Sequence, residues 1–170
     1  MRIRKSPGLD IINVLLLLLI LLTLAFIWSR SCKSIPASRA ESEAVLNVLR
    51  YPLELLVGEG NATDHLVRKL AHFFEFGVFG VEISALAWHS RDCSAKAMAL
   101  TLLLGFLCGA IDETIQAFTG RGNQFSDVLL DFSGFVTGTI LLYILYRMLK
   151  GKFYQNKINR SPNIQSPDAQ

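Results

Sequence analysis

Four apolar segments alternate with polar connections along the chain. The first covers residues 11–28, carries no charge, and has only Asn13 and Thr23 as polar members. Each of its many Leu, Ile, Val and Phe residues contributes roughly −0.3 to −0.6 kcal/mol at the bilayer centre. The basic residues before it also suit a signal peptide, but the run is longer than the ~7–15 apolar residues of such a segment. We therefore predict an uncleaved first transmembrane helix.

The later apolar segments cover residues 70–88, 97–118 and 128–149, and each has ionisable residues, mostly toward one end. A charge at the bilayer centre costs roughly 2.5–3.5 kcal/mol, so these residues are expected near helix ends or against protein. Taken alone, the three segments would also suit a soluble helical bundle. Beside the first segment they predict an all-α integral membrane protein with four transmembrane helices.

The distribution of Lys and Arg predicts that both termini lie in the cytoplasm. With this topology ten basic residues fall inside and seven outside, in keeping with the positive-inside rule. The predicted organisation is a cytoplasmic N-terminus (1–10), a first helix (11–28), an extracytoplasmic connector (29–66), a core of three helices (67–150) and a disordered cytoplasmic tail (151–170).

The connector contains a second kind of apolar pattern. Eight aliphatic residues lie between Ser42 and Gly58, in a stretch that Pro52 divides. Proline removes a helical hydrogen bond and disfavours the helix before it. We predict an amphipathic helix that is interrupted near Pro52 and that lies on the outer membrane surface or caps the bundle.

Composition agrees with a membrane class and excludes others. Hydrophobic residues make up 51% of the chain and charged residues 18%, against about 25% charged in soluble domains. The net charge of +3 is too small to indicate a nucleic-acid partner. Three cysteines cannot close a disulfide framework, and their spacing matches no zinc motif.

The predicted topology gathers most of the unexpected polar residues near the outer face. They lie at the start of the second helix, the end of the third and the start of the fourth: Lys69, His72, Glu75, Asp112, Glu113, Gln116, Arg121, Ser126, Asp127 and Asp131. Separations of three and four residues place many of them along shared helical stripes. Ionisable residues inside a membrane indicate a functional site by default.

Three kinds of chemistry fit these residues. In an acid/base site, His72 transfers a proton, Glu75 or Glu113 orients it, and Lys69 and Arg121 hold an anionic head group. A divalent cation could instead be held by Asp112, Glu113 and Asp127 with His72. The third reading is structural, with the carboxylates paired to Lys69, Arg121 and Gln116 to pin three helices together. No cofactor is assigned, and no metal ligand is among the site residues we select.

Several other residues have structural interpretations. Gly105 with Gly109, and Gly134 with Gly138, form small-residue stripes that allow close helix packing. Ser126 is expected to cap the fourth helix, and Asp127 to complement its dipole. Glu82 lies seven residues after Glu75, deeper in the same helix, and no partner for it can be named.

A series of short motifs connects these residues in order along residues 61–147. They are Lys69-x-x-His72-Phe73-x-Glu75, Glu113-x-x-Gln116, Gly120-Arg121 and Ser126-Asp127, followed by Gly134 and Gly138. Together they resemble the VanZ-like family. Phe76 stands where Tyr is usual in that family, and Asp131 where Asn is common.

The resemblance implies a multi-pass protein of the bacterial plasma membrane, in a family whose namesake is associated with teicoplanin resistance. We expect a protein that modifies or alters a lipid or lipid-linked cell-wall precursor at the outer leaflet. His72, Glu75, Glu113 and Asp127 are the expected catalytic residues, and Lys69, Asp112, Gln116, Arg121 and Ser126 the expected binding residues. The alternative is a non-catalytic membrane module that binds lipid, antibiotic or a partner protein. A homo-oligomer is compatible with either function.

Overall fold

The computed structural model describes residues 10–89, 95–121 and 124–159, and these residues form helices without any strand. The helices are α1 (Ile11–Ser31), α2 (Ile35–Val57), α3 (Asp64–His89), α4 (Ala95–Phe118) and α5 (Phe125–Asn159). Four of them, α1, α3, α4 and the part of α5 up to Leu149, are long and apolar enough to cross a membrane. The predicted all-α class with four apolar spans is confirmed.

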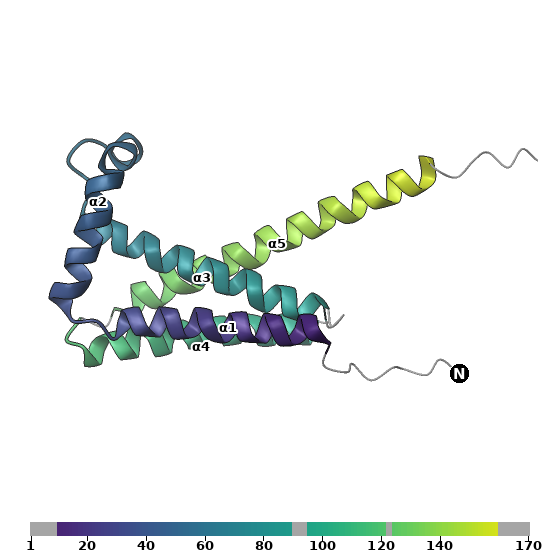
Figure 1. The fold of residues 1–170 in the computed structure, drawn as a ribbon, viewed down its shortest axis with the longest axis horizontal. Coiled ribbons are helices and arrows are strands. Elements are labelled where there is room, and N and C mark those ends of the chain that lie inside the picture. Colours follow the sequence, from purple (N-terminus) through teal and green to yellow (C-terminus); the bar gives the residue numbers. More distant parts are fainter. Residues whose placement is uncertain (1–9, 90–94, 122–123, 160–170) are drawn as a thin grey trace, which may run out of the picture.

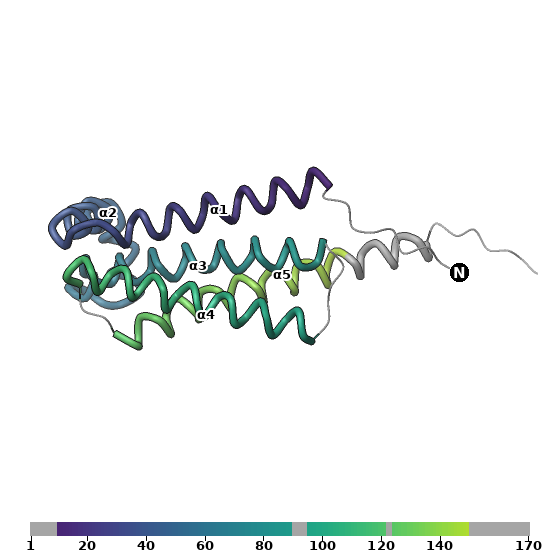
Figure 2. Tube along the Cα trace, turned by 90° about the horizontal axis from the view of Figure 1, so that it is seen from below, coloured from purple at the N-terminus to yellow at the C-terminus, as the bar shows by residue number. Residues whose placement is uncertain are grey.

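Helix α3 is the centre of the bundle and packs against the other four helices. Figure 1 shows α1, α3 and α4 running along the same axis, while α5 crosses α3 and diverges from the bundle toward its own C-terminal end. Figure 2 shows α3 between α1 on one side and α4 and α5 on the other. Helix α2 runs crosswise at the end of the bundle where α1 ends and α3 begins.

Glycines bring the backbones of α3 and α5 together. A Cβ atom at Gly138 would lie 2.8 Å from the carbonyl carbon of Gly77, and one at Gly80 would lie 2.9 Å from that of Phe135. A side chain at either position would therefore push the helices apart. The predicted small-residue stripe on the last helix is confirmed as the surface that contacts α3.

The buried core combines aromatic and aliphatic residues from four helices. Its members are Ile20, Ile27, Phe76, Phe79, Cys108 and Phe135. Phe79 packs edge-on against Phe135, with 5.4 Å between ring centroids. On α4, Gly105 faces that same Phe135 ring, and Gly109 faces Asp131. Large aliphatic side chains are exposed along α1, α4 and α5, as expected for helices that contact lipid.

The connector helix differs from the prediction in length and continuity. Helix α2 begins at Ile35, with Pro36 in its first turn, and passes through Pro52 to Val57. Pro36 fits because the first turn needs no backbone donor. Leu46 and Leu53, on either side of Pro52, are both buried with Val67 of α3, and this packing holds the helix together across the missing hydrogen bond. Its position outside the membrane stays a prediction.

Two predicted boundaries also move. Helix α1 continues past residue 28 to Ser31, so Arg30 and Ser31 belong to the helix and not to the connector. Helix α5 continues to Asn159, which makes residues 151–159 helical where a disordered tail was expected. No proline lies between Phe125 and Pro162 that would end this helix earlier. Residues 160–170 lie outside the described residues.

Candidate functional site

The polar residues of α1, α3, α4 and α5 meet at one end of the bundle, the end over which α2 lies (Figure 1). Helices α1 and α4 end there, and α3 and α5 begin there. This arrangement brings together residues that are far apart in the sequence. The predicted convergence of these residues at one level of the bundle is therefore seen in the structure.

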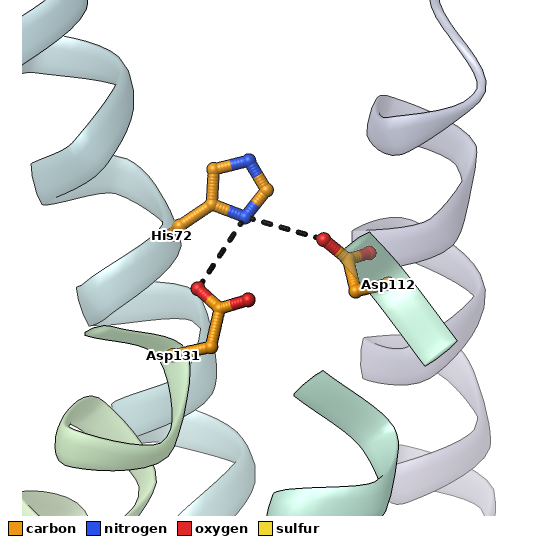
Figure 3. A group of neighbouring side chains, drawn as sticks. All are labelled: His72, Asp112 and Asp131. Carbon is orange, nitrogen blue, oxygen red and sulfur yellow. Dashed lines mark ion pairs between the residues drawn. The ribbon is translucent and has the colours of Figure 1, made fainter. Parts of the chain in front are cut away.

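His72 and two carboxylates form the centre of the site. The Nδ1 atom of His72 lies 3.6 Å from Oδ2 of Asp112 and 3.8 Å from Oδ1 of Asp131. Figure 3 shows the imidazole above both carboxylates, with its other ring nitrogen pointing away from them. Asp112 is fully buried and Asp131 is 1% exposed. Three helices, α3, α4 and α5, thus each supply one member of this group.

Neutral side chains hold Asp112 in place. Ser31 at the end of α1 donates a hydrogen bond of 2.6 Å to Oδ1 of Asp112. Gln116, one turn further along α4, donates from its side-chain amide to Oδ2 of Asp112 at 2.8 Å and to Glu113 at 3.0 Å. Asp112 and Glu113 therefore share one amide donor, and the side chains that donate these hydrogen bonds to the two carboxylates are neutral.

Several buried polar atoms of the site lack a hydrogen-bond partner among the described residues. These are Nδ1 of His72, Oδ2 of Asp131, Oε2 of Glu113 and Nε of Arg121. Buried polar groups in folded proteins are nearly always paired, and exceptions often mark functional sites. These atoms are the ones at which the group could bind a ligand.

A cavity of about 250 Å³ opens over this group. Its walls carry four permanent cations, Arg39, Arg68, Lys69 and Arg121, and three carboxylates, Glu113, Asp127 and Asp131. His65, His72 and Gln116 also line it. The cavity combines a cationic wall with the imidazole and carboxylates of the polar group, which suits an anionic ligand.

Two predicted binding residues have defined partners at the cavity wall. Nζ of Lys69 lies 2.8 Å from Oδ1 of Asp127, so the predicted catalytic carboxylate Asp127 is held by a cation and not by His72. Arg121 follows Gly120, whose φ of +81° makes the turn after α4. One of its terminal nitrogens donates to the carbonyl oxygen of Lys33 at 2.7 Å, and this bond ties the turn to the end of α1.

Glu75 lies apart from the cavity. Its Oε1 is 3.1 Å from Nε of Arg30, so Glu75 pairs with α1 and does not orient His72. Arg30 also reaches Glu41 of α2 at 3.4 Å. Lys33 donates a hydrogen bond to the same Glu41 carboxylate, and this bond lowers the pKa of Glu41 below its ordinary value. A chain of charges therefore connects α3, α1 and α2 at this end.

Ser126 and Glu82 have surroundings that the sequence did not predict. Ser126 was expected to cap the last helix, but α5 already begins at Phe125, so Ser126 lies in its first turn. Ser126 is exposed and is not among the residues that line the cavity. Glu82, for which no partner was named, accepts a hydrogen bond of 2.8 Å from Thr23 of α1.

Asp131 and Ser31 take part in the site and Arg30 pairs with Glu75 beside it, although none of the three is among the site residues predicted from the sequence. Asp131 lies four residues after Asp127 and faces the same stripe of α5, which was the available signal. Ser31 and Arg30 were assigned to the connector because the apolar run ends before them. Of the carboxylates at this end, Asp112 and Asp131 lie beside His72 and form a group with it that Glu113 and Asp127 do not join.

Comparison with known proteins identifies a family. The model of a protein family described as VanZ/LLP1 matches residues 11–146. The matched range includes α1, α2, α3, α4 and most of α5. No curated protein and no solved structure matches the chain.

Proposed function

The chain belongs to the VanZ/LLP1 family and is a multi-pass membrane protein, and from this premise we propose that it binds and alters an anionic lipid or lipid-linked component of the bacterial cell envelope. We place this reaction at the outer leaflet of the plasma membrane, the side on which the predicted topology puts the cavity. Removing or masking the anionic group would weaken binding of amphiphilic antibiotics such as teicoplanin.

The cavity carries this proposal. Four cations surround a space of about 250 Å³, which is below the ~300–1,000 Å³ of pockets that enclose whole small molecules. A phosphate-bearing head group fits such a space, while its hydrocarbon chains remain outside in the bilayer. Arginine and lysine are the residues that bind phosphate oxygens best.

Lys69 and Arg121 bind the anionic head group in this proposal. Glu113 is 3% exposed, lines the cavity, and has one carboxylate oxygen without a partner among the described residues. We assign it the proton transfer to or from the bound head group. His72 and the carboxylates beside it supply the electrostatic environment beneath that group.

The test is a mass-spectrometric profile of membrane lipids and lipid-linked wall precursors. Cells that express the wild type are compared with cells that express Glu113→Gln at equal membrane abundance. Glu113→Gln keeps the side-chain shape and removes the titratable group. Glu43→Gln is the matched control, because it is the same substitution at an exposed position of α2.

We expect a lipid species that appears or disappears with the wild type and the Glu43→Gln control but not with Glu113→Gln. Identical profiles for all three proteins would refute an enzymatic role. In that outcome, the function that remains is binding of lipid, antibiotic or a partner protein without chemistry.

A further inference from the structure

Two fully buried carboxylates face the same imidazole nitrogen without a permanent cation beside them. Among the described residues, the ion pairs of Asp112 and Asp131 involve only His72, while Lys69 pairs with Asp127 and Arg30 with Glu75. Burying an uncompensated carboxylate costs several kcal/mol. Two of them in one place therefore need a proton or a metal cation to neutralise them.

The distances within the group favour a metal. Nδ1 of His72 is 3.6 and 3.8 Å from its two carboxylate oxygens, which is beyond the ~2.7–3.2 Å range of hydrogen bonds. Ligand atoms ~2.0–2.2 Å from a tetrahedral zinc ion lie roughly 3.3–3.6 Å apart. The three atoms lie within 4.8 Å of one another, so small side-chain movements bring all three to one ion.

Asp131 gives an independent indication of a ligand. It is 1% exposed, its Oδ2 atom has no hydrogen-bond partner among the described residues, and its Oδ1 atom points toward His72 (Figure 3). A buried carboxylate without donors is a costly feature for a helix that only packs. The absence of donors is explained if Asp131 coordinates a cation.

We propose that His72, Asp112 and Asp131 bind a divalent transition-metal ion of the Zn²⁺ type. One imidazole and two carboxylates are a donor set for zinc and its neighbours, whereas Mg²⁺ and Ca²⁺ prefer oxygen ligands alone. Ser31 and Gln116 hydrogen-bond Asp112 and hold it in position, as residues behind metal ligands commonly do. Three protein ligands leave one position of a tetrahedral ion open.

His72 and Asp131 both line the cavity, so an ion bound to them would be within reach of a ligand in the cavity. There the ion would bind an oxygen atom of the anionic head group, opposite the cationic wall. This last step rests on the proposed function, but metal binding itself does not. The two can therefore fail separately.

The experiment uses the full chain purified in detergent, stripped with a chelator and titrated with ZnCl₂ alone. Isothermal calorimetry and elemental analysis should give one Zn²⁺ per wild-type chain, and Zn²⁺ should raise the melting temperature. We expect Asp131→Asn and His72→Gln each to weaken binding by more than about tenfold, since changes even behind metal ligands have effects of that size. Mg²⁺ should not compete at equal concentration.

Asp127→Asn is the matched control for Asp131→Asn. It is the same substitution one turn earlier in α5, at a residue that also lines the cavity but pairs with Lys69. It should weaken zinc binding much less than Asp131→Asn does, because Asp127 pairs with Lys69 and is not a ligand. Failure of the wild type to bind zinc, or equal loss in both variants, would overturn the proposal. If zinc binds and the lipid profile is unchanged by expression, only the proposed function fails.

Discussion

Replacing Gly138 by alanine should loosen the crossing of α3 and α5. The new Cβ would lie 2.8 Å from the carbonyl carbon and 3.2 Å from the Cα of Gly77, whereas carbon atoms in contact are ~3.5–4.0 Å apart. Relieving the shorter of these contacts requires helix α5 to move by roughly 0.7–1.2 Å, and overpacking of this kind costs about 1–3 kcal/mol. Alanine recovers up to about 1 kcal/mol through its better helix propensity.

Gly77→Ala separates the two contributions. A Cβ at Gly77 would meet only the carbonyl oxygen of Gly134, at an ordinary distance of 3.5 Å, so this variant gains the helix propensity without the clash. SDS-induced unfolding in mixed micelles, followed by circular dichroism, should rank Gly138→Ala about 1–3 kcal/mol below Gly77→Ala. Equal stabilities, or the reverse order, would show that the two backbones do not approach as described.

Two further predictions concern the ends of the bundle. The hydrogen bond from Lys33 lowers the pKa of Glu41 below its ordinary value of 4.5. The Glu41 carboxylate therefore stabilises the contact between α1 and α2 at neutral pH, and this stabilisation is lost as the pH falls through the lowered pKa. Proteolysis of α2 in the wild type should increase below that pH, whereas Glu41→Gln should show the increased rate at every pH. In a cysteine-free background, a membrane-impermeant thiol reagent added to intact cells should label Glu59→Cys and not Ser6→Cys, and the opposite labelling would reverse the predicted orientation.

The four spans follow from composition because the bilayer sets a simple requirement of length and hydropathy. The stripes within each helix also follow, since residues three and four apart share a face. These two rules are enough to bring Lys69, His72, Glu113 and Gln116 to one end of the bundle. The close packing of Gly138 was predictable for the same reason.

Partner choice across helices does not follow from these rules. Which carboxylate faces His72 depends on how α3, α4 and α5 are rotated and how closely they approach. Gly109 decides part of this, because a Cβ there would be 3.3 Å from the Cβ of Asp131, and glycine lets Asp131 come in beside Asp112. A hydropathy pattern does not predict how closely two helices approach each other. The continuity of α2 through Pro52 likewise depends on tertiary packing.

The bond between Ser31 and Asp112 has a consequence for the order of synthesis. The two residues are 81 positions apart in the chain, and ribosomes add ~5–20 residues per second. The end of α1 therefore waits roughly 4–16 s for its partner. Until Asp112 has been made, the hydroxyl of Ser31 must hydrogen-bond to water or to backbone groups. The group at His72 is complete only once α5, which supplies Asp131, has been synthesised.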